Sequence, residues 1–190
     1  MDPQSARRKA CSAEEYLAIE RLAEERHELI AGEILARPRG SRRHALIAAN
    51  LVGGLGNPLR DRPCLVVGSH MRVAAATVGL YTYPDVVVVC GGAQFIDEGE
   101  DTLTNPGVIV EVLSPTTESY DRGKKFEQYR AIASLTDYVL VSQEALLVEH
   151  FVRQPGGAWL LTEHRAGDRL TFDSLGCSIP LAEIYLKVLA

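Results

Sequence analysis

The chain has 190 residues, of which 46% are hydrophobic and 24% are charged, and its formal net charge is −5. This length and apolar content predict a single domain over residues 1–190 that buries a core without disulfides or structural metal. The negative charge argues against broad, nonspecific binding to nucleic acid, but it does not exclude a local site.

Neither a membrane span nor an export signal is expected. No uninterrupted apolar run reaches the ~18 residues of a transmembrane helix, and residues 1–9 lack the apolar core of a signal peptide. We therefore expect a cytoplasmic protein. Its cysteines are too widely spaced for paired zinc ligands, and we expect reduced thiols. They are Cys11, Cys64, Cys90 and Cys177.

The first elements of the chain are predicted from capping and turn signals. Ser12 and Glu15 form a capping-box pattern, which predicts a helix from Ser12 to about Glu25. Residues 27–30 and 33–36 flank a short turn with alternating character, as in a β-hairpin. A turn at residues 38–40 should close this hairpin.

A second helix and four strands are predicted next. Ser41 resembles another helix cap, and the glycines and proline of residues 53–58 are expected to weaken and end that helix. Short runs rich in β-branched residues, each bounded by glycine, proline or polar residues, then predict strands. These runs are 64–68, 71–75, 84–90 and 107–113.

The last third of the chain returns from helix to strand. Residues 119–133 have helical composition, and strand character follows over 138–141, 146–152, 159–162 and 170–172. We expect these strands to join the earlier ones in one mixed sheet. The predicted fold class is therefore α/β, as a layered α+β domain with a central sheet flanked by helices.

Glu111 is the residue of this sequence that most suggests chemistry. It lies within the apolar run 108–113, where an ionised carboxylate must be paired, protonated or bound to a cation. Asp85 opens the preceding strand, so pairing of the two strands would bring both carboxylates together. Carboxylate oxygens suit hard cations such as Mg²⁺ or Mn²⁺. The sequence thus predicts a metal site formed by Asp85 and Glu111.

Such a site is suited to phosphodiester hydrolysis. The metal would stabilise charge that develops on phosphate oxygens, while a nearby lysine would orient or help deprotonate the attacking water. Basic residues occur in clusters that could form a rim around this acidic centre, although charged clusters in a sequence often form only solvated surface. The clusters are 7–9, 37–39, 42–44, 60–62 and 122–125.

Several segments together resemble a known family. They are Tyr83-Pro84-Asp85 before a valine strand, Glu111 to Pro115, Asp121 to Lys125, Tyr129, Tyr138 to Val141, Glu28 to Glu33, and His44. These segments resemble the Uma-two family of restriction-endonuclease-like proteins, within the PD-(D/E)XK nuclease superfamily. The resemblance covers most of residues 27–141. It implies a restriction-endonuclease-like core and a magnesium-dependent endonuclease acting on DNA.

One position departs from the superfamily pattern. The usual lysine, two residues after the second carboxylate, is replaced by Leu113. The family resemblance implies that a lysine of the following helix takes its place, and the matching residue is Lys125. On a helix, Lys125 shares one face with Asp121 and Tyr129. Lys124 is the weaker candidate because it points about 100° away.

Further site candidates have ordinary structural interpretations as well. Glu28 and Glu33 could supply a third ligand, but hairpin acids usually face solvent. His44 could contact a phosphate or simply lie on a helix surface. Asp121 could join the site or form an exposed helix ion pair with Lys125.

Three functions remain open at this point. The first is a metal-dependent endonuclease, which would favour a two-fold homodimer if it cuts both strands. The second is a catalytically inactive nuclease-like fold that binds nucleic acid or protein, which Leu113 and the net charge favour. The third is a hydrolase of small phosphoesters, which would have a short, enclosed pocket.

Overall fold

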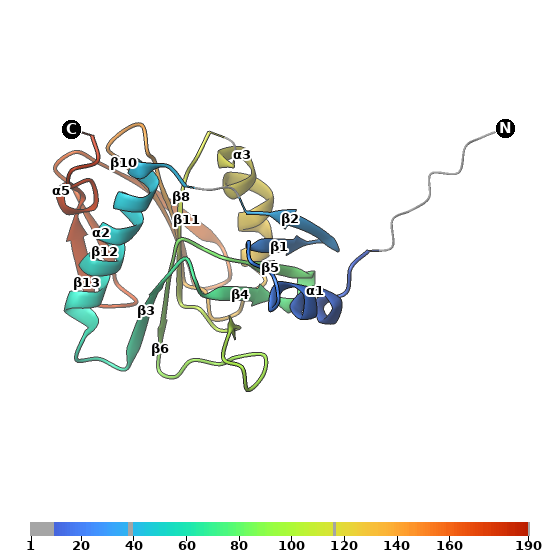
Figure 1. Cartoon of the computed structure of the whole chain (residues 1–190). Coiled ribbons are helices and arrows are strands. Elements are labelled where there is room, and N and C mark those ends of the chain that lie inside the picture. Colours follow the sequence, from blue (N-terminus) through green and yellow to red (C-terminus); the bar gives the residue numbers. More distant parts are fainter. Residues whose placement is uncertain (1–9, 38–39, 116, 190) are drawn as a thin grey trace.

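The structure, a computed structural model, describes residues 10–37, 40–115 and 117–189 (Figure 1). The first helix, α1 (Ala13–Glu20), begins at the predicted capping box. Ser12 Oγ accepts a hydrogen bond from the amide of Glu15, and the Glu15 carboxylate accepts one from the amide of Ser12. The helix ends at Glu20 instead of near Glu25, because the buried Glu20 carboxylate binds the amide of His27 at 2.9 Å and fixes the start of the next strand.

The predicted hairpin is present as β1 (His27–Ile30) and β2 (Glu33–Ala36). Ala31 and Gly32 in its two-residue turn have φ angles of 50° and 85°. Positive φ at both positions gives the turn a twist that matches the flanking strands. Of the turn predicted after the hairpin, Pro38 and Arg39 lie outside the described residues.

The second helix, α2 (Arg42–Leu59), starts at the predicted cap, where Ser41 Oγ accepts from the amide of His44. The sequence predicted that the glycines would weaken and end this helix, but the helix continues through Pro58. Its apolar face is fully buried at helical spacing, which stabilises the whole length. That face consists of Ile47, Leu51, Leu55 and Leu59. Gly54 allows close approach, since a Cβ there would lie 3.2 Å from Ile179.

The strands form two larger sheets and one short hairpin, not the one mixed sheet that was predicted. The six-stranded sheet has the order β11-β10-β9-β8-β6-β3, antiparallel except between β8 and β9. Its strands are β3 (Cys64–Gly68), β6 (Val86–Cys90), β8 (Val108–Val112), β9 (Asp137–Val141), β10 (Leu147–Arg153) and β11 (Trp159–Arg165). The α+β class with mixed sheets flanked by helices is confirmed.

The five-stranded sheet has the order β2-β1-β5-β4-β7. It adds β4 (Arg72–Ala75), β5 (Leu80–Thr82) and β7 (Thr102–Leu103), with a short 3₁₀ turn at Ala76–Val78 between β4 and β5. Near the C-terminus, β12 (Arg169–Phe172) pairs with β13 (Cys177–Pro180), and α5 (Leu181–Ile184) follows. None of β5, β7, β13 and α5 was predicted from the sequence.

The helical region after β8 is also more broken than predicted. It consists of α3 (Glu118–Tyr120), a π-helical segment (Asp121–Lys125) and α4 (Phe126–Tyr129). A π-helical turn accommodates one more residue than an α-helical turn and is often found at functional sites. Here it carries Asp121 and Lys125, both buried.

The two faces of the six-stranded sheet pack against different partners. On one face, alternate residues of the central strands, such as Val88 and Val110, pack against α2 and α5. On the other face, residues such as Val87 and Ile109 pack against α4 and the five-stranded sheet. Figure 1 shows α2 on one side of this sheet and β1, β2, β4 and β5 with α1 on the other. The central strands are thus buried on both sides, as their apolar sequences predicted.

A disulfide joins Cys64 and Cys90. The two residues lie opposite each other in the antiparallel register of β3 and β6, so they are neighbours although 26 residues separate them in sequence. The expectation of reduced thiols is therefore wrong for this pair, because spacing along the chain carries no sign of strand register. Cys11 and Cys177 are free thiols.

Membrane insertion through a helix finds no support in this fold. In residues 10–37, 40–115 and 117–189, no helix is both long enough and apolar enough to span a bilayer.

Candidate active site

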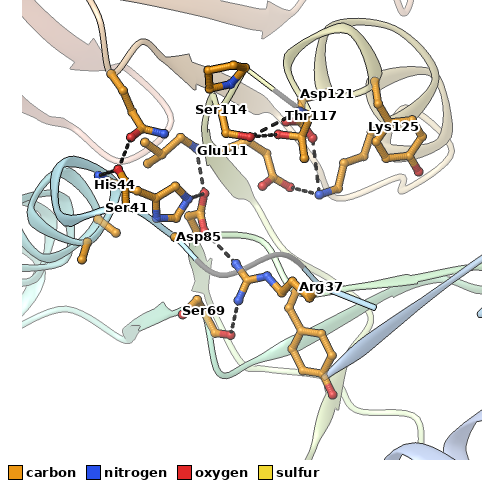
Figure 2. A pocket seen from close by; sticks show the side chains of 18 of the residues that line it. Arg37, Ser41, His44, Ser69, Asp85, Glu111, Ser114, Thr117, Asp121 and Lys125 are labelled. Atoms are coloured by element: carbon orange, nitrogen blue, oxygen red, sulfur yellow. Dashed lines mark hydrogen bonds and ion pairs between the residues drawn. The ribbon is translucent and has the colours of Figure 1, made fainter. Parts of the chain in front are cut away.

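A cavity of about 580 Å³ opens where β6 begins and β8 ends. Val86 pairs with Val110 in the antiparallel register of these strands, so one residue further along, Asp85 is the neighbour of Glu111. The walls are completed by β1, the amino terminus of α2 and the π-helical segment. Figure 2 shows Asp85, Glu111 and Lys125 in this cavity, contributed by three different elements. The structure therefore brings together the three groups that the sequence analysis singled out.

Asp85 is 3% exposed, and both of its carboxylate oxygens are in contact with donors. Arg37 Nη2 donates to Oδ1 at 2.7 Å. His44 Nε2 lies 3.0 Å from Oδ2, which also accepts from the amide of Val112 at 2.8 Å. Burial alone would raise the pKa of Asp85, but the contacts with His44, Val112 and Arg37 outweigh it and lower the pKa. Asp85 is thus ionised at neutral pH.

Glu111 is 4% exposed, and its contacts with Lys125 and Tyr129 are both made by Oε1. Lys125 Nζ lies 3.0 Å away, and Tyr129 OH donates at 2.8 Å. Burial raises the pKa of Glu111 to about 8; the charge of Lys125 opposes this, and the carboxylates of Asp121, Asp85 and Glu28 add to it. Glu111 therefore tends to keep a proton at neutral pH.

Lys125 lies among three carboxylates. Besides Glu111, its Nζ is 3.6 Å from Glu28 Oε1 and 3.6 Å from Asp121 Oδ1. Burial would lower the pKa of Lys125, but these carboxylates raise it well above its usual value. The amine therefore keeps its positive charge although its side chain is only 7% exposed.

The carboxylate of Glu28 connects the hairpin to the strand that carries Asp85. Its Oε1 accepts from Thr82 Oγ1 and from the amide of Tyr83 at 3.1 Å. Because Pro84 and Asp85 follow immediately in the chain, this contact fixes the approach of the backbone to the cavity.

Not all sequence candidates reach the cavity. Glu28, His44 and Asp121 line it together with Asp85, Glu111 and Lys125. Glu33 does not, because it is exposed at the start of β2. Lys124 is exposed as well and is not among the lining residues. Both side chains are therefore exposed charges outside the cavity.

Arg37 and Gln143 are polar residues of the site that were not recognised as such from the sequence. Arg37 was noted only as part of a basic cluster, and nothing in the sequence paired it with Asp85. Gln143 Nε2 donates to the carbonyl of Leu113 at 2.6 Å, and its Oε1 accepts from Ser41 Oγ. Gln143 thereby ties the start of α2 to the end of β8. Since this bridge joins segments about a hundred residues apart, no local signal could have revealed it.

The donor set of the cavity suits a hard cation. Among the described residues, four carboxylates line it against the fixed cations Arg37 and Lys125, and these carboxylates add to the effect of burial, which raises the pKa of Glu111. Among the described residues, no three His, Cys, Asp or Glu side chains form a complete metal site. Magnesium does not need one, since one or two carboxylates and several waters commonly hold it. Asp85 and Glu111 therefore fit such an ion.

Comparison with known proteins defines the family. The sequence model of the Uma2 family, described as "Putative restriction endonuclease", matches residues 13–182. The chain belongs to the Uma2 family. The resemblance noted in the sequence is thereby confirmed, and the Uma2 match extends well beyond residues 27–141.

Relatives and a solved structure agree with the Uma2 assignment. The uncharacterised protein slr1290 of Synechocystis is 36% identical over 174 residues, which cover 92% of this chain and 90% of that protein. A second one, sll1609, is 37% identical over 155 residues, or 82% and 88% of the two chains. The crystal structure of a "putative nuclease belonging to DUF820" from Anabaena variabilis superposes with a TM-score of 0.76 at 16% identity, covering 93% of this chain and 98% of that one. This likeness shows a shared nuclease-like fold.

Proposed function

We propose that this Uma2 protein is a metal-dependent endonuclease of the PD-(D/E)XK type that hydrolyses phosphodiester bonds in DNA. The observation that supports the proposal most is the convergence of Asp85, Glu111 and Lys125 on one cavity. A buried carboxylate with a raised pKa beside a buried amine is typical of functional sites. The family description and the nuclease-like fold point in the same direction.

Asp85 and Glu111 would hold Mg²⁺ or Mn²⁺. When bound, such a cation activates water and stabilises negative charge on a phosphate oxygen. The protein supplies the geometry for this chemistry: the Val112 amide fixes one oxygen of Asp85, and Tyr129 OH fixes one oxygen of Glu111. Hydrolysis would use water directly, without a covalent enzyme intermediate.

Lys125 would orient the attacking water. Its ammonium group is held between Glu28, Asp121 and Glu111, so it has a defined position and keeps its proton. A fixed donor that needs no rearrangement during the reaction is an effective form of electrostatic catalysis.

The opposite wall of the cavity would contact the phosphate backbone. Arg37 and His44 line it, and α2 points its amino terminus there, where backbone amides and the helix dipole favour anions.

A cleavage assay tests the proposal. Supercoiled plasmid DNA is incubated with the protein and Mg²⁺ or Mn²⁺, with EDTA as the metal-free control. Glu111→Gln should reduce nicking by about 100-fold or more. Glu33→Gln makes the same substitution at an exposed position outside the cavity and should cut like the wild type. Equal cleavage by Glu111→Gln, or cleavage that persists in EDTA, would contradict the proposal.

A second candidate function is a binding module that no longer cuts. The contacts of Asp85 favour it, because Arg37, His44 and Val112 already satisfy both carboxylate oxygens without a metal. Such a module would bind a DNA duplex yet give no heat with Mn²⁺ in calorimetry. The endonuclease requires Mn²⁺ binding that is lost in Asp85→Asn.

The shape of the site argues against a hydrolase of small phosphoesters. A second, more open hollow shares Ala48, Ser69 and Asp85 with the cavity and continues to His70. A surface that extends from the carboxylates in this way suits a polymer strand better than a small, enclosed substrate.

A further inference from the structure

Arg37 lines the cavity and contacts the carboxylate of Asp85. It follows directly after β2, and its backbone amide continues the hairpin ladder by donating to the carbonyl of Arg26 at 2.9 Å. The Arg37 side chain is 20% exposed, whereas that of Asp85 is 3% exposed. Figure 2 shows the guanidinium group between Asp85 and the carbonyl of Ser69, which it also contacts, at 3.3 Å.

The two oxygens of Asp85 differ in how firmly they are engaged. Oδ2 accepts from the amide of Val112, which is part of β8 and cannot move away without disturbing the sheet. Among the described residues, Oδ1 has one partner, the guanidinium of Arg37. A divalent cation that binds Asp85 through Oδ1 would therefore compete with the positively charged Arg37 for this oxygen.

A guanidinium released from a carboxylate needs another anion. Its planar fork of N–H donors matches a phosphate as well as a carboxylate. Since Arg37 already lines the cavity, a phosphate held next to Asp85 lies within the reach of the same side chain. The exchange conserves the number of charge-assisted hydrogen bonds that Arg37 makes.

We propose that Arg37 exchanges partners, binding Asp85 Oδ1 in the metal-free protein and the DNA phosphate after a divalent cation has bound. The inference rests on the proposed function and adds a residue that couples metal binding to substrate binding. Arg37 would compete with the metal in the absence of DNA and would contact the substrate in its presence.

The alternative is a purely structural ion pair that keeps Asp85 ionised and in place. The two roles predict opposite effects on metal affinity. If Arg37 competes, Arg37→Gln should bind the cation more tightly than the wild type. If Arg37 only positions Asp85, the same substitution should weaken metal binding or leave it unchanged.

The experiment uses the full chain and two probes, Mn²⁺ alone and a fluorescent DNA duplex in Ca²⁺. Arg43→Gln is the matched control, because Arg43 lies on the first turn of α2 and pairs only loosely with Glu144. By calorimetry, Arg37→Gln should bind Mn²⁺ about threefold more tightly or better, and Arg43→Gln should remain within about twofold of the wild type. By fluorescence anisotropy, Arg37→Gln should bind the duplex about fivefold more weakly than Arg43→Gln does.

Arg37→Lys is a second variant that keeps the proposal testable if Arg37→Gln fails to fold. Lysine keeps the charge but lacks the planar fork, so Mn²⁺ affinity should stay near that of the wild type while duplex binding falls. Mn²⁺ binding of equal strength in the wild type, Arg37→Gln and Arg43→Gln would overturn the exchange but leave the metal site standing. Absence of Mn²⁺ binding in all of them would overturn the proposed function and the exchange together.

Discussion

Lys125 Nζ lies 3.0 Å from Glu111 Oε1, although the glutamate belongs to β8 and the lysine to the π-helical segment that follows. The contact explains how a carboxyl group is tolerated inside an apolar strand, because an opposite charge and the hydroxyl of Tyr129 both reach it. Because of the same contact, the pKa of Glu111 depends on the charge of Lys125, and the pKa of Lys125 depends on the charge of Glu111.

Removing the amine should therefore affect both activity and stability. Lys125→Met should lower plasmid cleavage by about 100-fold. Its free energy of unfolding should fall by less than the ~3–5 kcal/mol of an uncompensated buried charge, because Glu111 tends to keep a proton at neutral pH. Urea denaturation at pH 7 measures the loss. Lys124→Met is the control: this neighbouring lysine is exposed, so cleavage should be unchanged and stability should shift by no more than about 0.5 kcal/mol.

Glu111 should make stability depend on pH. Its pKa is about 8 in the folded protein against an ordinary value of 4.5, so the folded state binds this proton more tightly than the unfolded state. Its contribution to stability is complete below about pH 4.5 and is lost as the pH rises towards 8, a change on the order of 5 kcal/mol.

The control for this pH dependence is Glu111→Gln, which cannot ionise. Its unfolding free energy should vary less between pH 5 and pH 8 than that of the wild type, as urea titrations at the two pH values would show. Adding Mg²⁺ at the higher pH should restore stability to the wild type only. Parallel pH profiles for the two proteins would rule out Glu111 as the titrating group.

The disulfide between Cys64 and Cys90 should stabilise the sheet. It closes a loop of 26 residues, for which restriction of the unfolded chain is worth about 3–4 kcal/mol. A urea titration with and without reductant should show a difference of this size. A variant with serine at both positions should have the stability of the reduced protein and no response to reductant, whereas Cys11→Ser should behave like the wild type. A reductant effect below about 1 kcal/mol would contradict the prediction.

Two adjacent glycines of α2 should respond differently to alanine. A Cβ at Gly53 meets nothing within 4 Å, so Gly53→Ala should raise the unfolding free energy by about 0.5–1 kcal/mol through helix propensity. At Gly54 the added methyl group would lie 3.2 Å from the buried Ile179. Gly54→Ala should therefore gain less than Gly53→Ala or lose stability. Thermal unfolding of the two variants tests whether α2 continues through these residues in solution.

The site residues that could be predicted are those whose neighbours in the sequence already mark them as unusual. Glu111 could be recognised because a carboxylate in an apolar strand has few ordinary explanations, and Asp85 followed from the pairing of adjacent strands. Lys125 required the family resemblance, since helical spacing alone fits an exposed ion pair equally well. The partner of Asp85, Arg37, could not be found, because an arginine that precedes a proline in the sequence has no pattern of its own.

The fold was predictable to a similar extent. Capping residues located the starts of α1 and α2, and β-branched runs located β3, β6 and β8. The predictions that failed concerned features that depend on contacts between residues distant in sequence. The burial of four leucine and isoleucine side chains carries α2 past its glycines, and the strands divide into two sheets because α4 and the five-stranded sheet cover one face of the six-stranded sheet.

The π-helical segment Asp121–Lys125 separates two tasks that the usual nuclease pattern assigns to a single strand. Because the amine is delivered from outside the sheet, position 113 is free to carry leucine, which packs into the apolar core below the site. Substitutions that move or replace the amine of Lys125 can therefore accumulate in one short helical turn while the β-scaffold stays intact. Conversely, rewinding that turn to a regular α-helix would withdraw the amine without unfolding the protein.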